Sequence, residues 1–154
     1  MRDILFKAKR IDNGEWVEGL IWKKKYNTDK IFISCFPDKD DNEEVFVVDP
    51  NTICQYTGLT DKNGNKIWEN DILRYSYDYP DSPWLKAEGK TNDDIVYRTG
   101  NVFWQEWRGS WAVTSRIGKA GMNIDVFKYC RNPNRTEVIG NIFDNTELLE
   151  MRCE

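Results

Sequence analysis

Residues 101–113, NVFWQEWRGSWAV, decide the fold class of this chain. Aromatic and β-branched residues fill both halves of the stretch, and the Arg-Gly pair at 108–109 is typical of a turn, so the stretch predicts a β-hairpin. Side chains alternate between the two faces of a strand, which places Trp104 on one face and Phe103 and Trp107 on the other. We therefore expect one aromatic set to fill the core and the other to be exposed or to contact a neighbouring chain.

Shorter runs of the same kind lie on both sides of this hairpin. Each run is apolar or alternating and is bounded by Gly, Asn, Asp or Pro, as strands are. Asn-Gly pairs at 13–14 and 63–64 tolerate the positive φ angles of tight hairpin turns. Residues 144–151 predict a short C-terminal helix, with Asp144 or Asn145 as its N-cap. The other expected strands lie at residues 4–8, 16–22, 31–36, 45–48, 71–75 and 137–142.

The order of these runs predicts a mostly β protein with two parts. Residues 1–54 are expected to form a small N-terminal antiparallel sheet. Residues 55–154 are expected to form an SH3-like β-barrel with a short C-terminal helix, because closing a small sheet removes its exposed edges. One continuous domain is the alternative division. The segment 76–94 has no clear period and is expected to be a long loop of functional importance.

The composition excludes several classes of enzyme. The chain has 154 residues and a net charge of −4, and it contains no histidine. Ser-His-Asp catalysis, Cys-His catalysis and His-bearing zinc sites are therefore impossible. The four cysteines form no CxxC pair, and the chain has no nucleophile elbow and no phosphate-binding glycine loop. We expect no catalytic residues, no cofactor, no metal site and buried free thiols; a disulfide or a four-cysteine metal site is the alternative for the cysteines.

Two acidic turns resemble a calcium loop only superficially. The segment 38–44, DKDDNEE, has alternating oxygen ligands but has glutamate where such a loop needs its glycine. Asp61, Asn63 and Asn65 share the alternation but belong to a hairpin with an Asn-Gly turn. We interpret both segments as solvated loops.

Residues 55–72, QYTGLTDKNGNKIWENDI, closely resemble the central motif of the YopX family of phage and prophage proteins. Residues 138–149, VIGNIFDNTELL, resemble the closing motif of that family, and the strand at 4–8 fits its opening strand. Asn70 stands where the family usually has glycine, and asparagine tolerates the same left-handed backbone angles. The resemblance implies an SH3-type barrel, a phage or prophage setting in a bacterial cytoplasm and a homo-oligomer. It implies no activity and no catalytic residues.

The central motif also has an interpretation that needs no ligand. Its apolar residues would pack a hairpin, Gly58 and Gly64 would adopt special backbone angles, and Asp71 would accept hydrogen bonds from loop amides. We favour this structural role over a binding role. The apolar residues are Tyr56, Leu59, Ile67 and Trp68.

Residues 98–135 are the best functional lead, because they carry seven Lys or Arg against two Asp or Glu and are interleaved with aromatic residues. Cations that meet phosphates and aromatic rings that stack on bases are typical of single-strand binding, so nucleic-acid binding is one hypothesis. Exposed Trp and Tyr also anchor protein interfaces, and we favour a protein–protein or self-association surface that includes the loop at 76–95. The basic residues are Arg98, Arg108, Arg116, Lys119, Lys128, Arg131 and Arg135. The candidate interaction residues are Tyr79, Trp84, Trp104, Trp107, Arg108, Trp111 and Arg116.

The N-terminus and the hydropathy bear on location. No apolar run reaches the length of a membrane span, and the first ten residues have no apolar signal region. We therefore expect a cytoplasmic protein with no membrane partner. The expected function is that of a non-catalytic phage or prophage accessory protein that binds a protein partner or itself. A nucleic-acid-binding small barrel is the alternative.

Overall fold

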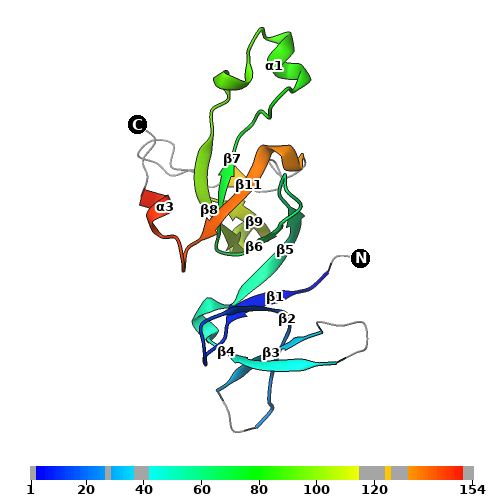
Figure 1. The fold of residues 1–154 in the computed structure, drawn as a ribbon, viewed down its shortest axis with the longest axis vertical. Coiled ribbons are helices and arrows are strands. Elements are labelled where there is room, and N and C mark those ends of the chain that lie inside the picture. Colours follow the sequence, from blue (N-terminus) through cyan, green and yellow to red (C-terminus); the bar gives the residue numbers. More distant parts are fainter. Residues whose placement is uncertain (1–2, 27–28, 37–41, 115–123, 126–131, 151–154) are drawn as a thin grey trace. The chain divides into compact units, whose positions relative to one another are not determined.

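A computed structural model describes residues 3–26, 29–36, 42–114, 124–125 and 132–150 of the chain. The chain divides into two compact units, Met1–Gly58 and Leu59–Glu154. Antiparallel strands are the main regular structure of both units, and short helices lie between them (Figure 1). The expected mostly β fold is confirmed. Strand β5 (Cys54–Thr60) contains the end of the first unit and the beginning of the second.

The first unit is built on hairpins. Strand β1 pairs with β2, β2 with β3 and β3 with β4, all antiparallel, while β5 pairs with the other side of β1. In the turn between β1 and β2, Gly14 has a φ of 73°, as its Asn-Gly pair predicts. The strand order of this sheet is β4-β3-β2-β1-β5-β6. Its other strands are β1 (Phe6–Lys9), β2 (Trp16–Lys23), β3 (Ile31–Cys35), β4 (Glu44–Val48) and β6 (Lys66–Trp68), of which β6 belongs to the second unit, and the helical turn η1 (Pro50–Thr52) precedes β5.

This sheet curls until its edge strand β4 returns to the end of β1. Arg10 and Val48 form an isolated β-bridge, and the N–H of Ile11 donates to the carbonyl of Val47 at 3.0 Å. The side chains on the inner side of the curl form the core of the first unit. That core consists of the buried residues Ala8, Ile33 and Val48, with Phe6, Val17, Ile21, Ile31, Cys35, Phe46 and Ile53 packed against it.

Gly19 lies where β2 changes its pairing partner. The first half of β2 pairs with β1 and the second half, from Leu20, pairs with β3. At this point the carbonyl oxygen of Ser34 lies 2.0 Å from the position that a Cβ of residue 19 would occupy. Such a close approach of two backbones requires glycine.

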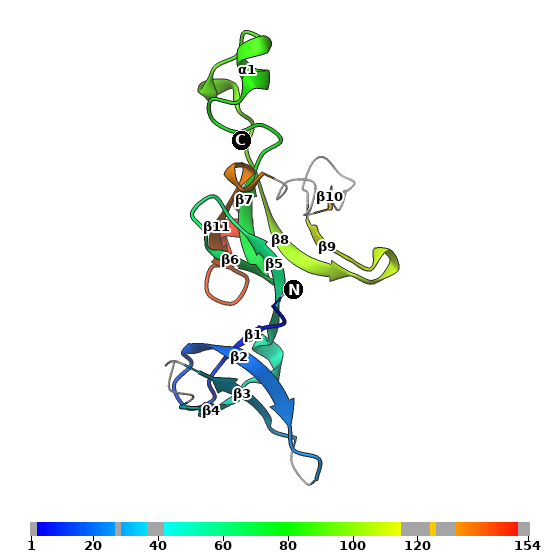
Figure 2. The ribbon, with the colours of Figure 1, turned by 90° about the vertical axis from the view of Figure 1, so that its right-hand side faces the viewer.

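The second unit repeats this arrangement in another sheet, of order β10-β9-β8-β7-β11. Strand β8 pairs first with β7 and then, from Val102, with β9. At the changeover, the carbonyl oxygen of Thr114 lies 1.9 Å from the Cβ position of Gly100. Figure 2 shows β8 bending away from β7, so that the β8–β9 hairpin projects from the sheet. The strands are β7 (Asp71–Tyr75), β8 (Arg98–Gln105), β9 (Ser110–Val113), β10 (Ile124–Asp125) and β11 (Thr136–Asn141).

The expected SH3-like barrel is not present as a closed ring of strands. Within the part of the chain that the structure describes, β10 and β11 are the two ends of the sheet and no pairing joins them. The expected C-terminal helix is present but short, because only Glu147–Glu150 is helical between 144 and 150. The other short helices are α1 (Pro83–Ala87), η2 (Asn92–Asp94), η3 (Glu106–Arg108) and η4 (Pro133–Arg135).

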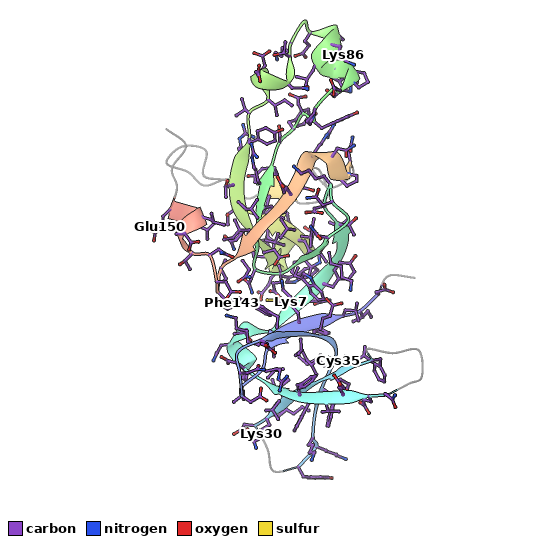
Figure 3. The ribbon with its side chains drawn as sticks, in the orientation of Figure 1. Lys7, Lys30, Cys35, Lys86, Phe143 and Glu150 are labelled. Carbon is purple, nitrogen blue, oxygen red and sulfur yellow. The ribbon has the colours of Figure 1, made fainter. Side chains whose placement is uncertain are left out.

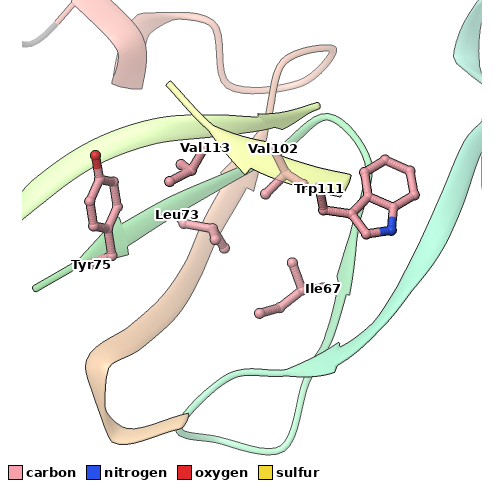
Figure 4. Packing of buried hydrophobic residues seen from close by; sticks show 6 residues of the cluster. All are labelled: Ile67, Leu73, Tyr75, Val102, Trp111 and Val113. Atoms are coloured by element: carbon pink, nitrogen blue, oxygen red, sulfur yellow. The ribbon is translucent and has the colours of Figure 1, made fainter. Parts of the chain in front are cut away.

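The core of the second unit is formed by side chains of β6, β7, β8 and β9 (Figure 4). Tyr75 is fully buried, and its hydroxyl donates to the carbonyl of Thr114 at 3.2 Å. Burial of a large aromatic ring with its hydroxyl satisfied stabilises a small domain strongly. The members of this cluster are Ile67, Leu73, Tyr75, Val102, Trp111 and Val113, with Leu59 and Val138 packed against it.

Asp61 lies at the beginning of the turn between β5 and β6 and is buried, whereas residues 62–65 of the turn are exposed, as expected of a solvated loop. Its carboxylate accepts the backbone N–H groups of Asn63 and Asn65, both at 2.9 Å, and that of Val138 at 3.0 Å. Burial alone raises the pKa of Asp61, but these hydrogen bonds outweigh it and hold the pKa below its usual value. The carboxylate therefore binds β11 to the β5–β6 turn.

Asn70 and Asp71 make further connections of this kind. Asn70 has a left-handed φ of 67°, as its place in the motif predicts. Its N–H donates to Val102 at 2.8 Å and its carbonyl accepts from Ile142 at 3.0 Å. The carboxylate of Asp71 accepts the N–H of Trp68 at 2.8 Å. The residues of the central motif thus connect β8 with the segment after β11, and this supports the structural interpretation of the motif.

Candidate interaction surface

The end of the β8–β9 hairpin presents two tryptophans and an arginine, which we call the hairpin surface: Trp104, Trp107 and Arg108. The side chain of Trp107 is 75% exposed and that of Trp104 is 44% exposed. The guanidinium carbon of Arg108 lies 4.4 Å from the ring centroid of Trp107. An exposed indole stacked with a cation is a preferred contact residue for another molecule.

Trp107 lies in the turn and not on the strand. Strand β8 ends at Gln105, and residues 106–108 form the single turn η3, which Gly109 ends with a φ of 60°. The turn predicted at 108–109 is therefore wider than a two-residue hairpin turn. As a result, Trp107 does not share a strand face with Phe103.

Trp111 belongs to the core and not to the surface, which corrects its place among the candidate residues. It lies directly opposite Trp104 in the β8–β9 register and is only 3% exposed. The two rings meet edge to face, with centroids 5.0 Å apart and planes at 72°. Buried Trp111 thus packs against the ring of exposed Trp104.

Gln105 is a polar residue that the sequence did not single out. It is buried, and its side-chain oxygen has no hydrogen-bond partner among the residues that the structure describes. A buried polar side chain is ordinarily placed where a hydrogen bond can satisfy it, and Gln105 is the residue next to Trp104 in β8. The sequence signal was weak, because a glutamine in an alternating strand is ordinarily assigned to the solvent face.

The 76–97 segment is an ordered excursion between β7 and β8 (Figure 1). Ser82 caps α1 by accepting the N–H of Leu85, and both residues are buried. Asp81 donates its N–H to the side chain of Asn92 at 2.8 Å and thereby joins the segments on either side of α1. This framework leaves aromatic side chains outside: Tyr77 and Trp84 are exposed and Tyr79 is half-buried.

Arginines stack on the tyrosines at the base of this excursion. The guanidinium of Arg135 lies 5.3 Å from the ring of Tyr77 and 5.8 Å from that of Tyr79, and within the described part of the chain its Nε has no hydrogen-bond partner. The guanidinium of Arg74 lies 4.0 Å from the ring of Tyr97. Such a cluster can bind an anionic group while its rings contact a planar one.

Only part of the predicted basic stretch can be placed. Arg98, Arg108 and Arg135 are among the described residues, and they lie in β8, η3 and η4. Arg116, which was a candidate interaction residue, lies outside the described residues. The same holds for Lys119, Lys128 and Arg131.

A second apolar surface, on the first unit, was missed by the sequence reasoning. The outer face of β2, β3 and β4 carries the exposed side chains of Leu20, Trp22 and Val45. The half-buried side chains of Phe32 and Val47 lie on the same face. We call it the outer sheet face and define it by Leu20, Trp22, Phe32, Val45 and Val47. The run 45–48 is wholly apolar, so alternation alone could not assign its faces.

Within the described ranges, no three His, Cys, Asp or Glu side chains are grouped as a metal site would require. Nor does any helix in those ranges have the length and apolar character needed to cross a membrane.

The model of one protein family, described as YopX protein, matches residues 5–150. The chain belongs to the YopX family. A search of curated proteins finds no match. Among solved structures, this YopX protein is similar to the crystal structure of protein EF1440 from Enterococcus faecalis, with a TM-score of 0.51 and 23% identity over 97% of this chain and 99% of that chain. That likeness concerns the fold.

Proposed function

We propose that this YopX-family protein is a non-catalytic interaction module of a phage or prophage, acting in the bacterial cytoplasm by binding a protein. The hairpin surface is its proposed contact region. The observation that carries the proposal is Trp107, a three-quarters exposed indole in the turn of a projecting hairpin whose strand β8 also carries exposed Trp104. Burial of large aromatic side chains supplies much of the binding energy of protein interfaces, and Trp and Arg are the residue types enriched there.

The hairpin is suited to this role because contacts with neighbouring side chains hold its exposed tryptophan rings in position. Trp104 rests against Trp111, which is part of the core cluster, and Arg108 stacks on Trp107. Side chains that are ordered before binding lose less entropy when a partner docks. Trp84 and Tyr79 of the 76–97 segment are proposed as additional contacts.

Nucleic-acid binding is the second proposal, and Arg135 is the observation that favours it. Its guanidinium stacks over Tyr77 and Tyr79, and guanidinium groups beside aromatic rings are the components of single-strand binding sites. Affinity for an oligonucleotide would then fall steeply with salt, because bound phosphates release counterions.

We also make a proposal about the fold that goes beyond the two observed sheets. We propose that residues 55–154 are an opened SH3-like barrel, in which the β5–β6 hairpin covers one side of the β7–β9 sheet. The support is Ile67 of β6, which lies in one buried cluster with Val102 of β8 and Val113 of β9.

The test of the main proposal is capture of partners from cells in which the phage or prophage is expressed. The full chain is compared with the W104A/W107A variant, and Tyr26→Ala serves as the control, since Tyr26 is as exposed as Trp107 but lies in the first unit. We expect the control to retain the captured proteins and the double variant to lose them. Equal capture by all three proteins would contradict the proposal.

Oligonucleotide binding decides the second proposal. Single- and double-stranded oligonucleotides are titrated at low and physiological salt against the full chain and against Arg135→Glu. Salt-sensitive binding that the variant loses supports a nucleic-acid site at Arg135. Absence of binding at low salt would contradict the nucleic-acid proposal.

A further inference from the structure

The two units of the chain have the same strand connectivity. In each unit four antiparallel strands follow one another, and a fifth pairs with the free side of the first, which gives the orders β4-β3-β2-β1-β5 and β10-β9-β8-β7-β11. A single helical turn that begins with proline precedes the fifth strand in both units, as η1 and as η4. Its cap is Asp49 in the first unit and Asn132 in the second, and each side chain accepts the N–H of the residue two positions later. The chain therefore contains the same five-strand unit twice.

The register of the strands matches the two units residue by residue. Gly19 and Gly100 are the reference points, because each is the glycine at which the second strand changes its partner and closely approaches a carbonyl group of the third strand or of the residue after it. Counting outward from these glycines along the pairings matches core positions with core positions. The matched pairs are Phe6 with Leu73, Ala8 with Tyr75, Ile21 with Val102 and Ile33 with Val113.

The two units differ in the connection between their first and second strands. In the first unit residues 10–15 make the whole connection, and the N–H of Arg10 closes this turn by donating to the carbonyl of Glu15 at 2.9 Å. In the second unit the matching connection consists of residues 77–96, the greater part of the 76–97 segment. Since a turn of six residues is sufficient in the first unit, the strand connectivity does not require the longer segment.

The longer connection is ordered by contacts within itself. Leu85 of α1 and Ile95 are buried, and the carbonyl of Leu85 accepts the N–H of Lys90 at 2.8 Å. The side chains of α1, among them Lys86, lie beyond the ends of β7 and β8 (Figure 3). Ordering these residues costs conformational entropy, and ordered loops longer than the fold needs are typical of binding elements.

The surface of this connection is apolar and acidic. Trp84 and Val96 are each 69% exposed and Tyr77 is 57% exposed. Residues 77–96 carry five Asp or Glu against two Lys. An exposed indole is a preferred anchor in an apolar pocket of another protein, and an acidic surrounding attracts Lys and Arg and repels phosphate. The chemistry therefore fits a protein surface with a basic rim and does not fit a nucleic acid.

We infer that residues 77–96 are an addition to the repeated unit, and that they dock on a basic surface of a protein partner with Trp84 as the central anchor. The inference rests on the proposed function because it needs a protein partner. It goes beyond that proposal by making this segment a binding element in its own right and by stating the charge of the partner. The segment and the hairpin surface are different regions, so the two proposals can fail separately.

A graft between the two units tests whether the segment is an addition. Residues 77–96 are replaced in the full chain by the sequence of residues 10–15, RIDNGE. The graft keeps Ser76 and Tyr97, which match Lys9 and Trp16 at the ends of the shorter turn. We expect circular dichroism and thermal unfolding to show a folded protein. A graft that fails to fold would contradict the inference.

The docking is tested with a purified partner. Proteins that the full chain captures from cells expressing the phage or prophage are identified, and the dominant one is purified and titrated against each variant by calorimetry. Trp84→Ala and the graft are each expected to raise the dissociation constant at least about tenfold, because the central anchor is lost. Tyr26→Ala is the matched control, since Tyr26 is a similarly exposed aromatic residue of the first unit, and it should leave the dissociation constant unchanged.

Charge reversal tests the chemistry of the partner. E88K/D93K reverses two exposed acids of the segment, and K86E reverses an exposed lysine between them and Trp84 in the sequence. The first variant is expected to raise the dissociation constant at least about tenfold and the second to leave it unchanged or to lower it. The opposite order of the two variants would show an acidic partner and would overturn the inference.

The variant W104A/W107A separates this inference from the hairpin proposal. A partner that binds W104A/W107A normally but Trp84→Ala weakly supports the inference and contradicts the hairpin surface. A partner that binds Trp84→Ala and the graft as tightly as the wild type overturns the inference, whatever W104A/W107A does. Absence of any captured protein overturns it as well.

Discussion

A carboxylate oxygen of Asp61 accepts the backbone N–H of Val138 at 3.0 Å, across 77 positions of sequence. The same carboxylate accepts two N–H groups of its own turn. The residue therefore fixes the shape of the β5–β6 turn and the position of β11 together. The two sequence motifs that identify the YopX family, at 55–72 and 138–149, meet at this side chain.

Replacement of Asp61 by Asn is expected to lower the free energy of unfolding by about 2 kcal/mol, the range for hydrogen bonds to a charged acceptor. The amide keeps one acceptor oxygen but turns an N–H₂ group toward backbone donors. Urea denaturation measures the change. Asp93→Asn, at an exposed acid in η2, is the control and should leave the stability unchanged. Equal stability of the wild type and the Asp61 variant would show that these bonds contribute nothing.

The lowered pKa of Asp61 predicts a pH dependence. A carboxylate whose folded pKa lies below its unfolded value of about 3.9 contributes stability above that value. The contribution is lost as the pH falls from the unfolded pKa through the folded one. Between pH 5 and the acid limb of unfolding, the unfolding free energy of the wild type should therefore fall more steeply than that of D61N. Parallel curves for the two proteins would contradict this.

Alanine at Gly100 is expected to destabilise the second unit by at least about 3 kcal/mol, because its Cβ would lie inside the carbonyl group of Thr114. Gly19→Ala should have a comparable effect on the first unit, through Ser34. Gly64 gives the comparison, since its Cβ would meet nothing within 4 Å and only its φ of 80° is unfavourable. Gly64→Ala should cost about 1 kcal/mol. Thermal unfolding of the three variants tests this ranking, which a larger loss at Gly64 would reverse.

The paired tryptophans of the hairpin should differ sharply in their effect on stability. Trp111→Ala removes a buried ring from the core and should cost about 3–5 kcal/mol. Trp104→Ala, at the opposite position, should cost about 1 kcal/mol, chiefly through the lost edge-to-face contact. Chemical denaturation of both variants provides the measurement. Similar losses at the two positions would mean that the hairpin is equally buried on both sides of the pair.

Local features of the fold could be predicted because they depend on nearby residues. Gly14 and Gly64 have the positive φ angles that their Asn-Gly pairs predict, and Asn70 has the left-handed angle expected of it. Asp71 binds a loop amide, as proposed from its place before a strand. These features follow from backbone sterics and short-range hydrogen bonds, which the sequence displays directly.

Burial that depends on distant segments could not be predicted. Alternation correctly places Val102 and Trp104 on one face, yet Val102 is fully buried and Trp104 is exposed, because the core ends before the hairpin does. Asp61 looked like one more turn aspartate, and its burial depends on β11, far along the chain. Helix α1 is a single capped turn anchored by Leu85, too short to show a period.

The curl of the first unit and the hydrogen bond from Val138 to Asp61 have a common consequence for aggregation. A strand at the edge of a sheet offers backbone groups to any other strand, and fibres grow in this way. Here the carbonyl of Val47 in β4 is engaged by Ile11, and in β11 the N–H of Val138 and the carbonyl of Thr136 are engaged by Asp61 and Lys62. These edges are therefore poor templates for strand addition, which disfavours the growth of a filament through them.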